Sequence, residues 1–556
     1  MYDHPESEYY SWVTLMNDWW KGAVVYQVYP RSYQDDNGDG VGDLKGITRR
    51  LPHIASLGAD AVWLSPIFTS PMKDMGYDVS DYCDIDPQFG TLSDFDDLIA
   101  KAHDLGLKII IDQVLSHTSN EHPWFKESRS SKDNAKADWY VWAECNEDGT
   151  PPNNWPSVFG GSAWEWDTSR RQYYLHNFLI EQPDLNFHNT EVQDALLETM
   201  RFWLDRGVDG FRLDTVNFYF HDKLLRNNPP EQRDDPRPEV NLYGMQDHIF
   251  SKTQPENIGF LRRMRALLDE YEGRTMVGEV GEGRRAVEVM AEYTKGNDRL
   301  HMAYSFGMLS PDFTAKHFRN QIQGFFDGAP DGWPCWSFSN HDVKRHVTRW
   351  LPHAASQDAV AKQAISMLVG FEGTLGIYQG EETGQLETVM EYHELTDPPG
   401  IRFWPDETGR DGCRTPMVWD ASENGGFSDV KPWLPVKAPQ HARSIASQEG
   451  QKDSVLEHYR SALSFRKENE TLVSGKTRFL DAPEPILAFV RGSGSDALLC
   501  VYNLSADTAE ISLTGLGDMT GPSLLATIDG NVLSLGANGA ALIKPATTGE
   551  AFALAN

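Results

Sequence analysis

The chain has 556 residues, of which 40% are hydrophobic and 24% charged, which is typical of a soluble globular protein with two or three domains. Its 82 acidic and 50 basic residues give a net charge of −32, which disfavours partners such as nucleic acid or an anionic membrane. We find no apolar run long enough to span a bilayer and no leader pattern in residues 1–20, so we predict a cytoplasmic protein.

Eight short, apolar, β-rich runs recur along the chain, and helix-like patterns lie between them. The runs cover residues 23–30, 60–66, 107–114, 210–214, 275–279, 300–306, 335–342 and 374–382. Two of the clearest helical patterns are 93–106 and 191–207, each of which ends at a glycine, as a helix C-terminus often does. Strands that alternate with helices in this way predict an α/β fold, a (β/α)8 TIM barrel.

The chain is longer than such a barrel requires, so we expect additional segments. A Trp-, Pro- and Asn-rich insertion at 117–187 follows the third strand and is predicted to form a separate domain B. A second, Gly- and Pro-rich insertion at about 383–450 follows the eighth strand. The barrel then comprises 1–116 and 188–473, and short alternating strands at 474–556 predict a C-terminal antiparallel β-sandwich.

The fourth strand, GFRLD, places Arg212 and Asp214 on one face of an otherwise apolar strand. A structural ion pair would explain them, but other predicted strands also end in polar residues. These residues are Asp112, Glu279, and His341 with Asp342. Because the active sites of TIM barrels lie at the carboxyl ends of the strands, we expect these side chains to share one cleft.

Two carboxyl groups across a cleft suit the hydrolysis of a glycosidic bond, in which one is ionised and the other protonated. We expect Arg212 to lower the pKa of Asp214 and keep it a nucleophile. Glu279 has no neighbouring cation in the sequence, so we expect burial to raise its pKa toward that of a general acid.

Five motifs occur in order along the chain, and two further motifs accompany them. They are DQVLSH (112–117), QPDLN (182–186), GFRLDTVN (210–217), VGEVG (277–281) and FSNHD (338–342), with DMGYD (74–78) and GRDGCRTPM (409–417). On these motifs the chain resembles the α-amylase superfamily, glycoside hydrolase family 13, and within it the α-glucosidase and oligo-1,6-glucosidase group.

The resemblance implies a retaining mechanism, with Asp214 as nucleophile, Glu279 as acid and base, and Asp342 as the residue that binds two glucose hydroxyls and stabilises the transition state. It also implies a closed glucose pocket and therefore exo-action. The residues implied to enclose the glucose are Asp74, Tyr77, His117, Arg212, His341 and Arg414.

The residue after the nucleophile is Thr215, which in the resembling group favours α-1,4-linked substrates such as maltose. An α-1,6-glucosidase of the isomaltose type, or a relative acting on sucrose or trehalose, is the alternative. Phe159 and Phe178 lie where relatives place aromatic entrance walls, although they could equally be core residues. Walls that exclude water favour transfer of glucose to other alcohols, so we expect transglucosylation beside hydrolysis.

Residues 35–43, DDNGDGVGD, have the every-second-residue spacing of a calcium loop. The candidate ligands are Asp35, Asn37, Asp39, the carbonyl of Val41, and Asp43. The twelfth position is Gly46, so the loop is no EF-hand, and a metal-free turn held by side-chain hydrogen bonds is the alternative. The resemblance favours a structural Ca²⁺ or Mg²⁺ remote from the cleavage site.

A different class shares this fold, the non-catalytic heavy chains of amino-acid transporters. These carry an N-terminal transmembrane helix and lack parts of the carboxylate set, and this chain has neither feature. We therefore expect an enzyme that acts on small neutral α-glucosides, without an organic cofactor, as a monomer or homodimer.

Overall fold

The computed structural model describes residues 18–233, 239–546 and 552–555. Of residues 1–20, on which the absence of a leader was judged, 1–17 lie outside the described residues. Within the described ranges, none of the helices combines the length and apolar character needed to cross a bilayer.

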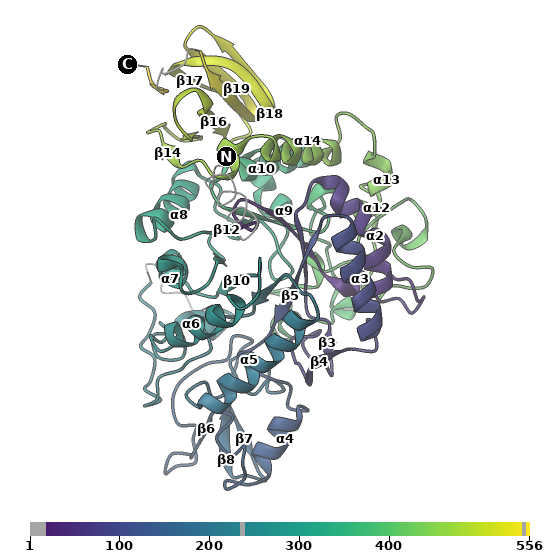
Figure 1. Ribbon diagram of the computed structural model, residues 1–556, viewed down its shortest axis with the longest axis vertical. Helices are drawn as coiled ribbons and strands as arrows, with labels where there is room; N and C mark the ends of the chain where they lie inside the picture. Colours follow the sequence, from purple (N-terminus) through teal and green to yellow (C-terminus); the bar gives the residue numbers. More distant parts are fainter. Residues whose placement is uncertain (1–17, 234–238, 547–551, 556) are drawn as a thin grey trace, which may run out of the picture.

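The centre of the molecule is an eight-stranded parallel sheet, as predicted (Figure 1). Its strands are β1 (Val24–Val28), β2 (Ala61–Leu64), β5 (Lys108–Gln113), β9 (Gly210–Leu213), β10 (Thr275–Val280), β11 (Met302–Ser305), β12 (Cys335–Ser337) and β13 (Thr374–Tyr378). They follow one another in the order β11-β10-β9-β5-β2-β1-β13-β12. A parallel bridge between Ala303 and Pro334 joins the first and last of these strands and completes the barrel.

Each barrel strand is followed by a helix that covers the outer face of the sheet. These helices are α2 (Leu44–Leu57), α3 (Leu92–Asp104), α5 (Thr190–Asp205), α6 (Asn257–Leu268), α7 (Ala286–Thr294), α8 (Ala315–Gly328), α10 (Gln357–Gly370) and α14 (Val455–Lys467). On α5 the side chains of Leu196, Met200 and Trp203, which lie on one face of the helix, are fully buried. Gly106 and Gly207 follow α3 and α5 with φ of 77° and 97°, which is the left-handed conformation expected beyond a helix end.

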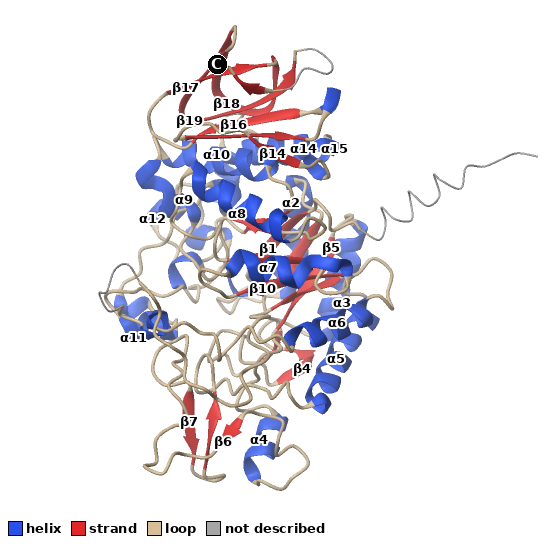
Figure 2. Ribbon diagram, turned by 90° about the vertical axis from the view of Figure 1, so that its left-hand side faces the viewer, coloured by secondary structure: helices blue, strands red, loops and turns tan. Residues whose placement is uncertain are grey.

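The segment between β5 and α5 forms a small unit at the lower end of the molecule (Figures 1 and 2). It contains α4 (Pro123–Ser130) and the antiparallel strands β6 (Trp142–Ala143), β7 (Trp164–Asp167) and β8 (Gln172–Leu175). A bridge between His117 and Asp184 joins the beginning of this insertion to its end. The insertion thus stands beside the carboxyl ends of the barrel strands.

The C-terminal region is an antiparallel sheet at the opposite end of the molecule (Figure 2). Its strands are β14 (Thr477–Phe479), β15 (Ile486–Arg491), β16 (Leu498–Asn503), β17 (Ala509–Thr514), β18 (Leu516–Asp529), β19 (Val532–Pro545) and β20 (Ala553–Leu554). Phe489 and Tyr502 on one face join the core of the barrel. Alternate residues such as Val490 and Val501 point into a separate apolar core within the C-terminal region, as strand alternation requires.

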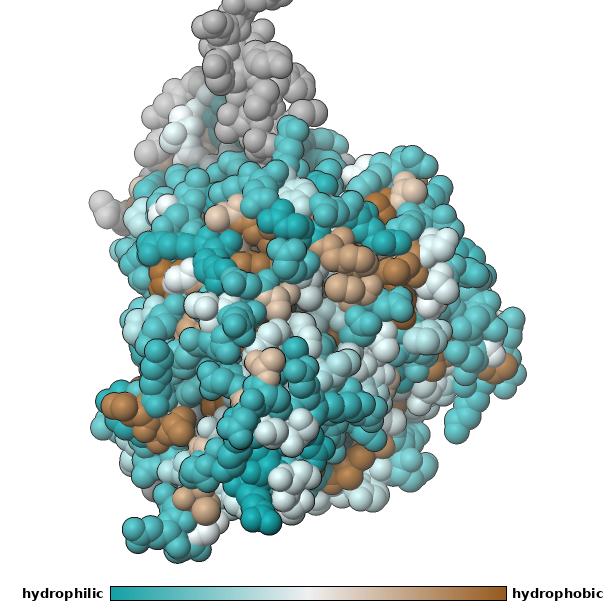
Figure 3. Space-filling view, turned by 60° about the horizontal axis from the view of Figure 1, so that its bottom comes forward, coloured by the Kyte–Doolittle hydropathy of each residue, from teal (hydrophilic) through white to brown (hydrophobic). Residues whose placement is uncertain are grey.

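The segment after β13 contains short helices and long loops. They include α11 (Pro398–Phe403), α12 (Ala438–His441) and α13 (Ile445–Gln448). The face of the molecule seen in Figure 3 is mostly hydrophilic, with small separate hydrophobic patches, as the high charge of the chain leads one to expect.

Candidate active site

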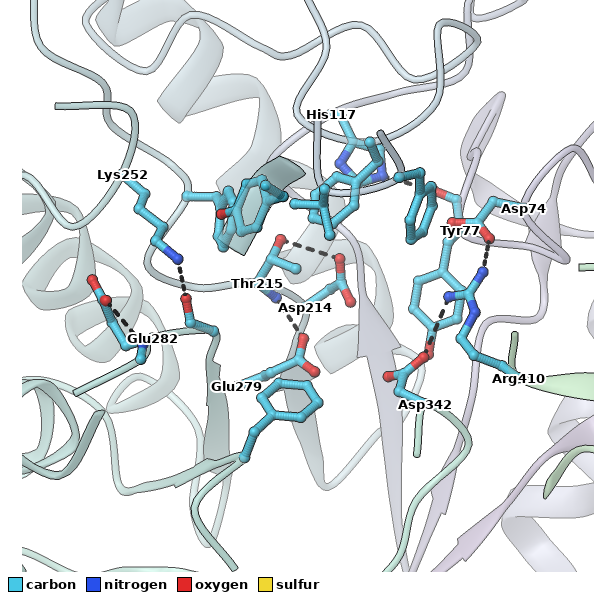
Figure 4. Close-up of a pocket in the computed structure, with 18 residues that line it drawn as sticks. Asp74, Tyr77, His117, Asp214, Thr215, Lys252, Glu279, Glu282, Asp342 and Arg410 are labelled. Atoms are coloured by element: carbon cyan, nitrogen blue, oxygen red, sulfur yellow. Dashed lines mark hydrogen bonds and ion pairs between the residues drawn. The ribbon is translucent and has the colours of Figure 1, made fainter. Parts of the chain in front are cut away.

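A cavity of about 410 Å³ opens beside the carboxyl ends of the barrel strands, and the three carboxylates predicted to be catalytic line it (Figure 4). Asp214 directly follows β9, Glu279 lies in β10, and Asp342 lies five residues beyond β12. Although far apart in the sequence, they face one space because the parallel strands end at the same side of the barrel.

Arg212 is the centre of a fully buried charge network at the base of this cavity. Its guanidinium contacts Asp112 at 2.7 Å, Asp214 at 2.8 Å and Glu279 at 2.7 Å. The strand register explains the convergence, because Arg212 pairs with Asp112 on β5 and with Val277 on β10, two residues before Glu279. All of these side chains therefore point to the same face of the sheet.

This network corrects one expectation from the sequence. Glu279 does have a neighbouring cation, since Arg212 contacts it as closely as it contacts Asp214. Burial raises the pKa of Asp214 to about 7, and it likewise raises the pKa of Glu279 to about 7, in each case against the opposing effect of Arg212. The expected lowering of the Asp214 pKa is therefore wrong, and the two carboxyls titrate as an interacting pair.

Thr215 connects the two carboxyls through an unusual backbone conformation. Its φ is 42°, a left-handed value that β-branched residues rarely adopt. In this conformation its backbone N–H donates a hydrogen bond to Glu279 Oε2 at 3.0 Å. Its hydroxyl donates to Asp214 Oδ2 at 3.2 Å and lies 2.9 Å from the Ser116 hydroxyl.

Two arginines surround Asp342 at one end of the cavity. Arg410 lines the cavity and contacts Asp74 at 2.7 Å and Asp342 at 3.4 Å, while Arg414 contacts Asp342 at 3.1 Å from a fully buried position. Burial opposes ionisation of Asp342, but His341 and the two arginines outweigh it and hold its pKa below the usual value. Asp342 is therefore the most firmly ionised of the three carboxylates.

Other residues predicted to enclose a glucose lie on or behind the same wall. Tyr77 and His117 line the cavity, and Tyr77 stacks on His341 with ring centroids 5.3 Å apart. His341 and Arg414 do not line it but lie behind Tyr77 and Asp342. Burial lowers the pKa of His117 to about 4, so its ring is neutral near pH 7 and is a hydrogen-bonding group.

Aromatic side chains form much of the remaining wall. Phe159 and Phe178 both line the cavity, with ring centroids 5.5 Å apart, and Phe218 packs against Phe178 at the same distance. Phe306 adds another apolar surface. The two predicted phenylalanines thus belong to the cavity wall, and the wall offers apolar faces on which a ring could stack.

Several lining residues were not predicted from the sequence. They are Val158, Phe218, Tyr243, Lys252, Gly281, Glu282, Gly283, Phe306 and Arg410. Arg410 had a signal, because it stands in the motif GRDGCRTPM from which Arg414 was chosen. Tyr243 and Lys252 had no such signal, because the sequence between β9 and α6 has no periodic pattern; in the structure, Tyr243 lies in the short 3-10 helix η2 (Leu242–Met245).

The loop predicted to bind a metal is held by hydrogen bonds from its own backbone. Asp35 accepts from the N–H groups of Gly38 at 2.7 Å and Gly40 at 2.9 Å, and Asp43 accepts from Asp36 and Gly46, each at 2.8 Å. The predicted ligand set was Asp35, Asn37, Asp39, Val41 and Asp43. Within the described ranges, no three or more acidic, His or Cys side chains gather closely enough to hold an ion. The loop thus has the hydrogen-bonded form left open above, and a structural Ca²⁺ or Mg²⁺ stays a prediction.

Fold and site together define a class of protein: a barrel enzyme whose paired carboxylates, at the strand ends, are arranged for chemistry on a glycosidic bond. The family model for the catalytic domain of α-amylase matches residues 27–475. The chain belongs to the α-amylase family, and it is a glycoside hydrolase.

Relatives match almost the whole chain. A probable α-glucosidase of Rhizobium meliloti (strain 1021) is 56% identical over 94% of this chain and 96% of its own length. An oligo-1,6-glucosidase of Heyndrickxia coagulans is 37% identical over 89% of this chain and 93% of its own. The crystal structure of the α-glucosyl transfer enzyme XgtA is similar with a TM-score of 0.92 and 50% identity, over 95% of this chain and 99% of that one.

Proposed function

We propose that the protein is a retaining, exo-acting α-glucosidase that releases glucose from short α-1,4-linked glucosides such as maltose and also transfers glucose to other alcohols. The observation that carries the proposal is the ion pair of Asp74 with Arg410 at one end of the cavity that holds Asp214 and Glu279. A pocket that ends in buried charges accommodates the end of a sugar chain rather than its middle. The α-glucosidase relative supports the same class of reaction.

In the proposed reaction, Asp214 attacks the anomeric carbon while Glu279 gives its proton to the departing oxygen, and a glucosyl ester on Asp214 results. Glu279 then takes a proton from water or from an alcohol as that oxygen bonds to the anomeric carbon and the ester bond breaks. Arg212 contacts both carboxyls, so it compensates charge in each step. Asp342, held ionised by its arginines, would stabilise positive charge on the sugar ring.

The preference for α-1,4 linkages is supported by Thr215, whose hydroxyl lies beside the nucleophile. Transfer to alcohols is supported by the aromatic wall and by the similarity to XgtA, which is an α-glucosyl transfer enzyme. The second candidate is an α-1,6-glucosidase, favoured by the oligo-1,6-glucosidase relative.

A substrate panel separates these candidates. We expect the purified protein to release glucose from maltose at least about ten-fold more efficiently than from isomaltose, sucrose or trehalose, a ratio that one or two lost contacts produce. Asp214→Asn should lower activity by about 10³-fold or more, because the nucleophile is lost. Preference for isomaltose or sucrose would refute the α-1,4 assignment, and activity that survives in Asp214→Asn would refute the mechanism.

A further inference from the structure

Lys252 stands out in the cavity because it is a lysine with only 5% of its surface exposed. Its ammonium donates a hydrogen bond to the carbonyl of Gly281 at 2.6 Å and lies 4.9 Å from the ring centre of Phe218 and 5.5 Å from that of Tyr243. Lysine is rarely buried unless its charge is used or paired. The ammonium has three N–H donors, and the Gly281 carbonyl occupies one.

Tyr243, beside it, also has unused hydrogen-bonding capacity. Its buried hydroxyl neighbours the Lys252 ammonium, but makes no hydrogen bond of good geometry within the part of the chain that the structure describes. Because an ammonium can only donate, the phenolic O–H is left to donate to a ligand. The ring itself is fixed, because it stacks on His248 with centroids 3.8 Å apart. The Lys252 ammonium and the Tyr243 hydroxyl are therefore adjacent hydrogen-bonding groups on residues that both line the cavity.

The position of Lys252 relative to the catalytic carboxyls indicates which part of a substrate the Lys252 ammonium and the Tyr243 hydroxyl could bind. In Figure 4, Asp214 and Glu279 lie between Lys252 on one side and the group of Asp74, Asp342 and Arg410 on the other. If the glucose to be cleaved lies against Asp74 and Arg410, the other partner of the scissile bond lies toward Lys252. A second cavity adjoins this side, and Lys252 and Tyr243 line both cavities.

We propose that Lys252 and Tyr243 recognise the hydroxyls of the group beyond the scissile bond, which is the second sugar in hydrolysis and the sugar acceptor in transfer. The inference rests on the proposed function and specifies the substrate class at that same site. A sugar ring offers both hydroxyl oxygens for the ammonium and an apolar face for Phe218, whereas a p-nitrophenyl group offers the face and only the weakly accepting oxygens of its nitro group. The pair therefore favours polyhydroxylated leaving groups and acceptors over aryl ones.

The test compares two substrates that share the glucose and differ in the leaving group, maltose and p-nitrophenyl α-glucoside. We expect Lys252→Met to lower the ratio of their kcat/KM values, maltose over aryl glucoside, by about ten-fold or more, as expected for the loss of a hydrogen bond to a charged group. Tyr243→Phe removes only the buried hydroxyl and should lower the same ratio, by about three-fold or more.

Arg410→Met is the matched control, because it alters the glucose side that both substrates share. It should lower both kcat/KM values and keep their ratio within about three-fold. If Lys252→Met lowers both values equally, the lysine only holds the Gly281 carbonyl and the inference is wrong. It is equally wrong if neither value changes. If Lys252→Met does not fold, Tyr243→Phe decides by the same ratio.

The failure of the proposed function would be recognised separately. In that case the unaltered protein would cleave neither maltose nor p-nitrophenyl α-glucoside, or it would cleave isomaltose or sucrose more efficiently than maltose. A protein that cleaves both, but whose variants leave the ratio unchanged, would retain the proposed function and lose this inference.

Discussion

The two ends of the active-site cavity are built differently. At the end proposed to bind glucose, hereafter the glucose end, Asp74 and Asp342 are bound to Arg410, which a third carboxylate, Asp397, contacts at 2.7 Å. At the other end, the charged group that lines the wall beside the aromatic rings is Lys252, with Glu282 next to it. A dense set of fixed hydrogen-bonding groups rejects any ligand that leaves one of them unpaired, whereas apolar walls tolerate varied shapes. Under the proposed function, this difference predicts strict selection of glucose and looser selection of the group bonded to it.

The substitution with the largest expected effect on stability and activity lies at the glucose end. Arg410→Met leaves the buried Asp74 and Asp397, and the partly buried Asp342, without their common cation, and removing one partner of a buried ion pair is strongly destabilising. We expect a loss of about 3 kcal/mol in the free energy of unfolding and a fall of about 100-fold in kcat/KM for maltose. Urea denaturation and steady-state kinetics measure the two. A stable variant with nearly normal kinetics would show that the density of charge at this end is not what selects glucose.

The carboxyls between the two ends should weaken the fold at neutral and alkaline pH. The pKa of Glu279 is raised to about 7 by burial, so the folded state holds a proton that the unfolded state has released once the pH exceeds about 4.5. Stability therefore falls as the pH rises from about 4.5 to 7 and stays lower above that. Glu279→Gln removes this loss, and we expect the variant to be more stable than the unaltered protein at pH 8 by on the order of 1 to 3 kcal/mol.

The measurement is the melting temperature of both proteins from pH 5 to pH 8. The two curves should lie close together near pH 5 and separate as the pH increases. Curves that stay parallel over the whole range would mean that Glu279 does not titrate in this window.

A smaller effect is expected at Thr215, which joins the two carboxyls. Thr215→Gly should relieve the cost of a left-handed β-branched residue and raise the free energy of unfolding by about 1 kcal/mol. Activity should fall by about ten-fold, because the glycine backbone holds the N–H donated to Glu279 less firmly and the hydroxyl beside Asp214 is gone. A loss of stability, measured by thermal unfolding, would show that the side-chain contacts outweigh the strain.

The smallest effect concerns the predicted metal loop, remote from both ends. If residues 35–43 bind Ca²⁺ or Mg²⁺, EDTA should lower the melting temperature by about 2 to 4 °C and leave kcat nearly unchanged. The purified protein should also contain about one metal ion per chain by elemental analysis. Without metal in the protein and with an unchanged melting temperature, the hydrogen bonds of Asp35 and Asp43 would account for the loop by themselves.

The two ends of the cavity also differ in how far they could be predicted from the sequence. The eight strands and the convergence of Asp214, Glu279 and Asp342 followed from local patterns, because strand periodicity and strand ends are local properties. The contact of Arg212 with Glu279 did not, because it depends on the register of β9 against β10.

The residues at the other end of the cavity, Lys252 and Tyr243, could not be predicted from the sequence for a related reason. They lie in the connection between β9 and α6, where no periodic pattern shows which side chains turn inward. The glucose end, by contrast, was covered by the motifs DMGYD and GRDGCRTPM, although the arginine chosen from the second motif, Arg414, lies behind the cavity and Arg410 lines it.

The measurement that tests the central claim most directly is the anomeric configuration of the glucose first released from maltose, followed by proton NMR before mutarotation. Attack by Asp214 followed by attack of water inverts the anomeric carbon twice, so the account predicts α-glucose as the first product. Initial release of β-glucose would mean a single displacement by water and would contradict the assignment of Asp214 as nucleophile.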